Sequence, residues 1–123
     1  MTDTTPQDSL ESLKVRLAKF AADRDWEQFH SPKNLSMALI AEAAELIEHF
    51  QWLTDEQSYA LPDDKKQEVA LELADILIYL IRVSDRLDIN VVDAAWKKIT
   101  INEDRFPIDK VRGDARRASE YND

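Results

Sequence analysis

The sequence has no cysteine and only one glycine, Gly113. Without cysteine there is no disulfide framework and no thiolate zinc site. The loops that cradle phosphate groups in P-loop and Rossmann proteins need several glycines, so neither fold is supported. Residues 1–6 contain no basic region and no apolar core, so we do not expect a signal peptide. Acidic residues interrupt the longest apolar runs, which argues against a membrane span and favours a soluble, cytoplasmic protein.

The net charge of the chain limits the kinds of binding partner that we expect. The net charge is −9 and the isoelectric point is about 4.7. A general nucleic-acid binder needs a basic face against phosphate, so nucleic acid is a disfavoured partner. A small phosphorylated substrate that arrives with its own metal ion is not excluded. The scarcity of glycine and the many Ala, Leu, Glu and Lys residues predict an all-α chain with a single core.

Hydrophobic periodicity and capping signals predict a bundle of four to five helices, four of which can be placed on the sequence. Ser31 is a good N-cap with a proline after it, Asp63 or Asp64 can cap the third helix, and Asn90 can cap the fourth. The expected helices cover residues 9–23, 31–52, 65–87 and 90–106. The third is apolar around most of its circumference, so we expect it to be buried. The predicted organisation is a flexible leader at 1–8, one domain at 9–107 and a flexible tail at 108–123.

Two pairs of carboxylates stand inside apolar helical runs. Glu42 and Glu45 are three residues apart, and Glu72 and Asp75 repeat that spacing. Residues at positions i and i+3 share one face of a helix, so each pair converges. Acids gathered in apolar surroundings resist joint ionisation, and a hard cation with oxygen ligands removes the conflict. Mg²⁺ fits best, with Mn²⁺ as a substitute, because it accepts carboxylates while it keeps water and phosphate oxygens as ligands.

A solvated helix face is the usual explanation for a single acidic pair. A metal site gains weight here because there are two pairs, on helices that we expect to be adjacent and antiparallel. Glu68 and Tyr79 extend the stripe of Glu72 and Asp75 along one helix face. Glu68 is either an outer ligand or exposed. His49 is interpreted as a capping or surface residue, since no other histidine stands at a zinc-like spacing from it.

The two acid pairs and the segments around them carry a family resemblance. E-x-x-E at 42–45 and E-x-x-D at 72–75 are similar to the signature of the all-α nucleoside triphosphate pyrophosphohydrolases, the MazG-like superfamily. The dCTP pyrophosphatase branch is the one that the chain resembles most, over about residues 10–107. The further segments that match are RDWEQFH at 24–30, P-x-NL at 32–35, E-x-FQW at 48–52, DILIYL at 75–80 and KI-x-IN-x-x-RFP at 98–107.

The resemblance implies an activity and a role for each matching residue. Such enzymes cleave the bond between the α- and β-phosphates of a nucleotide and release a monophosphate and pyrophosphate. The acids would hold Mg²⁺, and one of them, Glu42 or Glu45, would help to deprotonate the attacking water. The implied assignments are these: catalysis and metal, Glu42, Glu45, Glu72 and Asp75; phosphate and sugar, Tyr79, Lys98, Asn102 and Arg105; base, Trp26, Trp52 and His30.

The resemblance also implies an oligomer, either a dimer or a tetramer built from dimers, in which pockets are completed across the interface. The favoured substrates are dCTP and related, including modified, pyrimidine triphosphates. Leu17 stands where the dCTP branch has a histidine, so the base preference stays open. One alternative is a dUTPase-like or broad-specificity enzyme of the same superfamily. Another, from a different class, is an acidic helical interaction module without catalysis.

Overall fold

The computed structural model describes residues 9–115, which form helices, turns and loops with no β-strand among them. The all-α prediction is therefore confirmed for this part of the chain. The chain divides into two compact units, the first ending at Ile89 and the second beginning at Asn90. None of the helices in the described range is long and apolar enough to cross a membrane.

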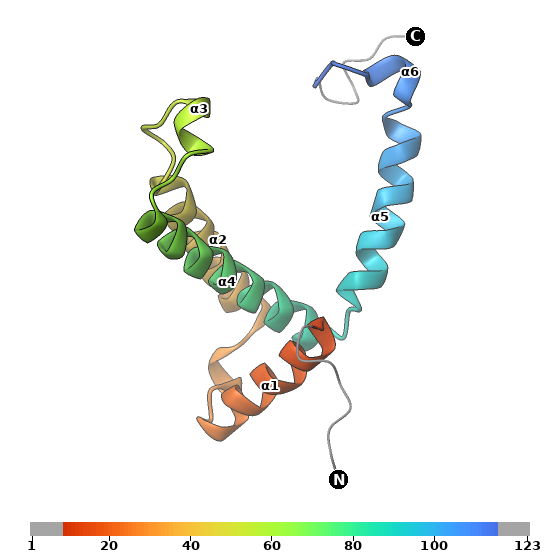
Figure 1. The fold of residues 1–123 in the computed structure, drawn as a ribbon. Helices are drawn as coiled ribbons and strands as arrows, with labels where there is room; N and C mark the ends of the chain where they lie inside the picture. The colour runs from red at the N-terminus through yellow and green to blue at the C-terminus, as the bar shows by residue number, and fades with distance from the viewer. Residues whose placement is uncertain (1–8, 116–123) are drawn as a thin grey trace. The chain divides into compact units, whose positions relative to one another are not determined.

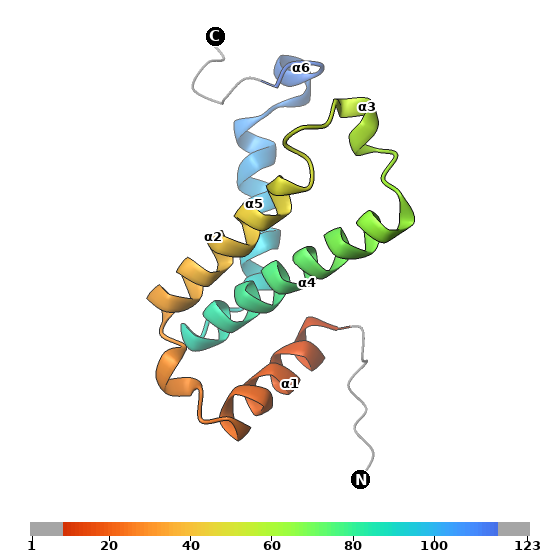
Figure 2. The same cartoon turned by 90° about the vertical axis from the view of Figure 1, so that its left-hand side faces the viewer.

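The first unit is built on two antiparallel helices. They are α2 (Pro32–Glu48) and α4 (Asp63–Arg86), which lie side by side along most of their length (Figures 1 and 2). Helix α1 (Leu10–Asp23) packs against α4. A single turn of 3-10 helix, η1 (Glu27–Phe29), lies in the connection from α1 to α2, and a short helix, α3 (Asp55–Ser58), lies between α2 and α4. This arrangement places the middle of α2 opposite the middle of α4.

The second unit contains α5 (Val91–Arg105) and a one-turn helix, α6 (Ile108–Val111). Phe106 caps the end of α5, and Pro107 then ends the helix as the sequence predicts. Helix α6 falls within the segment 108–123 that we expect to be flexible, and residues 116–123 of that segment lie outside the described residues. The predicted leader, residues 1–8, lies outside them as well.

Two of the predicted helix caps are confirmed and one is wrong. The side chain of Ser31 accepts a hydrogen bond from the backbone N–H of Asn34, at 3.1 Å, and Asn90 accepts one from Asp93, also at 3.1 Å. Neither Asp63 nor Asp64 caps α4, because the N-cap position belongs to Pro62. The two aspartates lie in the first helical turn instead, where their negative charge complements the helix dipole.

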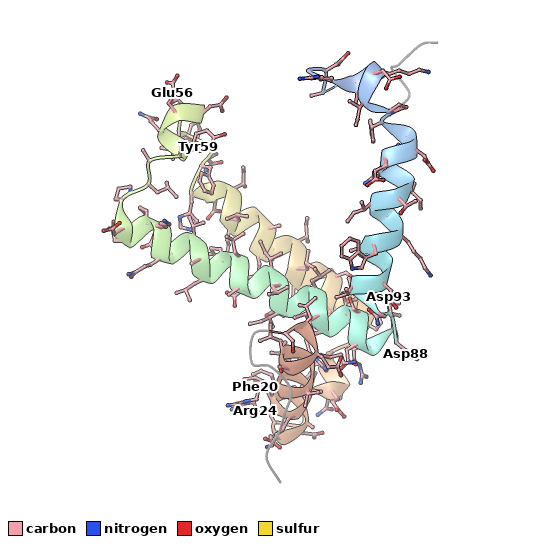
Figure 3. All side chains as sticks on the ribbon, turned by 45° about the vertical axis from the view of Figure 1, so that its right-hand side comes forward. Phe20, Arg24, Glu56, Tyr59, Asp88 and Asp93 are labelled. Carbon is pink, nitrogen blue, oxygen red and sulfur yellow. The ribbon has the colours of Figure 1, made fainter. Side chains whose placement is uncertain are left out.

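Helix α2 ends earlier than its hydrophobic pattern predicts, at Glu48 rather than near Trp52. The reason is a second helix start only a few residues later. Thr54 and Gln57 form a reciprocal capping box, which fixes the short helix α3 and turns the chain before it reaches α4. The side chains of Glu56 and Tyr59 project from this segment (Figure 3), and Tyr59 is 92% exposed.

The core of the first unit is small. Its buried apolar residues are Ala21, Leu35, Val69 and Ile81, contributed by α1, α2 and α4. The prediction that the third helix is buried is wrong for part of its surface within this unit, because Leu71 is 69% exposed and Leu73 is 51% exposed. Within the first unit, helices α1 and α2 cover only part of α4.

Candidate functional site

Three acidic side chains converge where α2 faces α4. Glu42 and Glu45 come from one turn of α2, and Glu72 comes from α4. One carboxylate oxygen from each of the three lies within 4.8 Å of the others. The i, i+3 spacing on α2 and the antiparallel packing of α4 together produce this cluster. The convergence that the sequence predicts is therefore present for three of the four acids.

The electrostatics of the cluster suit a cation. Burial is the largest cause that raises the pKa of Glu42, to about 7, and the carboxyl groups of Glu45 and Glu72 and the charge of Asp75 add to it. One oxygen of Glu42 and one of Glu72 are buried with no hydrogen-bond partner. A buried acceptor without a donor is costly, and a divalent cation would satisfy both oxygens at once. The all-oxygen donor set fits Mg²⁺ or Mn²⁺.

Asp75 is not among the three acids whose oxygens converge, although its charge acts on Glu42. It is exposed and follows Glu72 by three residues on α4, so it borders the cluster on the same helix face. Tyr79 is one turn further along that face and is half-buried.

His49 lies closer to the acids than its sequence context indicates. It caps the C-terminal end of α2, as expected, and its Nε2 atom is 3.7 Å from an oxygen of Glu72. Its Nδ1 atom is 3.9 Å from an oxygen of Glu68, which also binds Lys65 at 3.1 Å. A lone histidine at a helix end does not by itself indicate that the side chain lies beside an acidic cluster. Only the antiparallel pairing of α2 with α4 could have predicted it.

The residues predicted to bind phosphate and sugar divide between the two units. Tyr79 is on α4, beside the acids. Lys98, Asn102 and Arg105 are spaced four and three apart on α5, so they share one face of that helix within the second unit. Lys98 and Arg105 are exposed, while Asn102 is half-buried. Their approach to the acids stays a prediction.

The residues predicted to bind the base lie in the connections at the two ends of α2. Trp52 is 86% exposed in the turn after α2, and Trp26 is 43% exposed in the connection that precedes it. Trp26 packs edge-on against Phe20, with ring centroids 5.7 Å apart, and its ring lies 6.3 Å from that of His30. Phe20 also holds the guanidinium of Arg24 above its face, at 3.5 Å (Figure 3).

His30 is not itself exposed toward solvent like the two tryptophans. Its Nδ1 atom lies 3.4 Å from the guanidinium of Arg82, and Arg86 binds its carbonyl. Arg82 is a buried cation that the sequence does not single out, because a basic residue in an apolar helix usually indicates a surface position. Its spacing from Tyr79 along α4 is the one signal that could have placed it on the inner face.

Sequence comparison agrees with this geometry. The profile of the MazG-like family matches residues 38–122, which include both acid pairs. The chain belongs to the MazG-like family. The resemblance stated from the motifs is thus confirmed at the level of the family.

Several relatives extend the comparison beyond the MazG-like profile. The chain is 40% identical over 113 residues to dCTP pyrophosphatase 1 of Mus musculus, which covers 90% of this chain and 66% of that protein. It is 40% identical over 118 residues to dCTP pyrophosphatase 1 of Homo sapiens, covering 94% and 69%. The chain therefore spans about two thirds of the length of these relatives.

A solved structure is similar to this chain over nearly the whole length of the solved protein. The crystal structure of a pyrophosphatase from Archaeoglobus fulgidus matches with a TM-score of 0.77 and 34% identity. The match covers 87% of this chain and 98% of that one. The helical arrangement described above is thus shared with a pyrophosphatase of known structure.

Proposed function

We propose that this protein is a Mg²⁺-dependent nucleoside triphosphate pyrophosphohydrolase that cleaves the bond between the α- and β-phosphates. The observation that carries the proposal is the cluster of Glu42, Glu45 and Glu72, with two buried oxygens that have no hydrogen-bond partner. Its similarity to dCTP pyrophosphatases and to a solved pyrophosphatase supports the same reaction.

The acids of α2 and α4 would hold the metal, with Asp75 completing the set. When bound, Mg²⁺ supplies charge neutralisation for the phosphates and lowers the pKa of a coordinated water. One of the acids, Glu42 or Glu45, would accept the proton of the attacking water. One oxygen of the Glu42 carboxyl group is buried, and burial is the largest cause of the raised pKa of this group.

The remaining residues bind and orient the substrate. Tyr79, together with Lys98, Asn102 and Arg105, would donate hydrogen bonds and positive charge to the phosphates and the sugar. Phosphoryl transfer depends mainly on this kind of positioning and charge stabilisation. Trp26 and Trp52 offer aromatic faces on which a base can stack, and His30 lies beside Trp26.

The proposed substrate class is dCTP and related pyrimidine deoxynucleoside triphosphates, including modified ones. The similarity to dCTP pyrophosphatase 1 proteins supports a cytosine base. A dUTPase-like or broader preference is the alternative within the same family, and Leu17 is the position that keeps it open. We place the activity in the cytoplasm, in the removal of unwanted nucleotides from the pool.

The proposed assembly is a homodimer or a tetramer of two dimers. The support is the amount of apolar surface that one chain leaves exposed on α2 and α4, above all Leu71, Leu73, Ile40 and Ile47. Exposed apolar surface beyond scattered single residues often marks a site of protein–protein interaction. A second copy would cover them and would help to close a pocket around the nucleotide.

Product analysis tests the reaction directly. Purified protein would be incubated with dCTP and Mg²⁺, and the products would be followed by ³¹P NMR. We expect dCMP and pyrophosphate. Formation of dCDP and inorganic phosphate would contradict cleavage at the α-β bond. A panel with dUTP, dTTP, dATP, dGTP and 5-methyl-dCTP then ranks the bases, and a faster rate with dUTP would favour the dUTPase-like alternative.

A further inference from the structure

The connection between α1 and α2, residues 24–31, is hydrogen-bonded to α4 at His30. Arg82 of α4 donates hydrogen bonds through Nε to the Nδ1 atom of His30, at 3.4 Å, and its Nη2 atom lies 3.4 Å from the same nitrogen. Arg86, one turn further along α4, donates through Nε to the carbonyl oxygen of His30 at 3.1 Å. Two arginines of one helix therefore hold the side chain and the backbone of a single residue.

Arg82 is an unusual residue to find there, because it is only 4% exposed. Its third contact is Asp85, whose carboxylate oxygen lies 3.3 Å from Nη1 and whose side chain is partly open to solvent. Burying a guanidinium costs free energy even when it is paired, and an apolar side chain at such a position is often as stable or more stable. The stability of the fold alone is therefore a poor reason for an arginine at position 82.

The connection that Arg82 holds also carries Trp26. The His30 ring lies 6.3 Å from the Trp26 ring, and the single turn of η1 joins them, with the N–H of Phe29 bonded to the carbonyl of Trp26. A bond from Asn34 to the carbonyl of Phe29 ties the same turn to α2. The contacts thus run from the guanidinium of Arg82 by hydrogen bonding to the His30 ring, and from the His30 ring by proximity to the Trp26 ring.

Arg82 also lies on the helix face that bears the acids. Glu72, Asp75, Tyr79 and Arg82 are spaced three, four and three apart on α4, so they form one stripe. Contacts between α2 and α4 confirm this register at the acid end, where His49 meets Glu72. From Asp75 to Arg82 the helix rises about 10 Å. The acidic residues and Arg82 are therefore close to one another along one face of α4.

We propose that Arg82 is a positioning residue for Trp26, acting through His30, and that it sets the orientation in which the indole receives the base of a pyrimidine nucleotide. The inference rests on the proposed function for the role of Trp26 in base binding. Arg82 does not itself touch the substrate in this account. It holds the neutral imidazole of His30, whose Nδ1 atom is the acceptor, and burial and the charges of Arg82 and Arg86 lower the pKa of His30, although Glu27 opposes them.

The test is a double-mutant cycle on nucleotide binding. The variants are Arg82→Met, Trp26→Ala and the two together, with Arg16→Met, an exposed arginine of α1, as the control for loss of one positive charge. The ligand is α,β-methylene-dCTP, which resists cleavage at the α-β bond, with Mg²⁺ present. Affinity is measured by titration calorimetry. Thermal unfolding of each variant is recorded in parallel.

We expect Trp26→Ala to weaken binding roughly ten-fold, the magnitude of one stacked base. Arg82→Met should weaken binding at least about three-fold while the melting temperature stays equal or rises, because an apolar side chain replaces a buried cation. The double variant should bind no more weakly than Trp26→Ala alone, since residues that act through one another are not additive. In turnover of dCTP, Arg82→Met should raise KM with little change in kcat.

Independent losses that multiply in the double variant would overturn the inference, and so would an Arg82→Met variant that binds as the wild type does. These two results concern the inference alone. A wild-type protein that binds no nucleotide would overturn the proposed function as well, so the two failures are distinguishable. If Arg82→Met does not fold, Arg82→Lys replaces it in the cycle. Lysine keeps the charge beside Asp85 but loses the paired Nε and Nη2 contacts to His30, so the same pattern is expected at smaller amplitude.

Discussion

Binding of Mg²⁺ should release a proton from Glu42, in an amount that depends on pH. The pKa of this carboxyl is about 7 in the metal-free protein, because of burial, its neighbours Glu45 and Glu72, and the charge of Asp75. A carboxylate must lose its proton before it can bind a cation. The protonated fraction, and so the number of protons released per chain, should be roughly 0.9 at pH 6, about 0.5 at pH 7 and about 0.1 at pH 8.

The assay is isothermal titration of Mg²⁺ into the protein in two buffers that differ in ionisation enthalpy, at each of these pH values. The difference in heat divided by the difference in buffer enthalpy gives the number of protons released. Glu42→Gln is the decisive control, because it removes this carboxyl and keeps His49, which lies 3.7 Å from Glu72. Release that is independent of pH, or that persists unchanged in Glu42→Gln, would refute the reasoning.

Four further predictions follow from the same residues. Without metal, the free energy of unfolding of the wild type, relative to that of Glu42→Gln, should fall from about pH 5 to about pH 8. The Glu42 carboxyl of the folded protein ionises near pH 7 rather than at its ordinary pKa of 4.5, so the folded state holds more protons than the unfolded state in this range. A difference in melting temperature between the two proteins that does not change with pH would contradict this. Glu72→Gln should abolish pyrophosphate release while circular dichroism shows an intact fold, and retained turnover would remove Glu72 from the metal site. Leu35→Ala should lower the free energy of unfolding by roughly 2–5 kcal/mol in urea titrations, since Leu35 is only 2% exposed; a loss well below that range would mean that the site collapses around the smaller side chain. Leu71→Glu with Leu73→Glu should reduce the mass measured by light scattering to that of one chain, and an unchanged mass would place the interface elsewhere.

The fold was predictable wherever a local signal decides it. The capping serine at position 31 with its proline, and Asn90 ahead of the last long helix, set two helix starts that the structure confirms. The premature end of α2 was not predictable from periodicity, because the apolar pattern continues to Phe50 while the capping box of α3 stops the helix. Here the apolar pattern and the capping residues favour different helix ends. Hydrogen bonds of the capping side chains decide between them, and hydrophobic periodicity does not reveal those bonds.

Burial was harder to predict than helix position. The apolar residues of α4 indicate a helix that is covered all around, yet Leu71 and Leu73 are exposed in one chain. A pattern of apolar residues indicates that a helix surface is packed against something. It does not indicate whether that surface packs against the same chain or against another copy. The candidate site divides in the same way. The pairing of Glu42 with Glu45 follows from their spacing, whereas the approach of Glu72 to them and the contact of His49 with Glu72 depend on the register between α2 and α4. The contact of Arg82 with His30 depends on the path of the connection that precedes α2.

The most direct test of the central claim is pyrophosphate release from dCTP, measured with Mg²⁺ present and again after chelation with EDTA. It should be run on the wild type, on Glu45→Gln and on Glu56→Gln, which removes an exposed carboxylate on α3 as a matched control (Figure 3). The account predicts release by the wild type and by Glu56→Gln only with Mg²⁺, and none by Glu45→Gln. Release that survives chelation, or an active Glu45→Gln variant, would contradict a metal centre built on these acids.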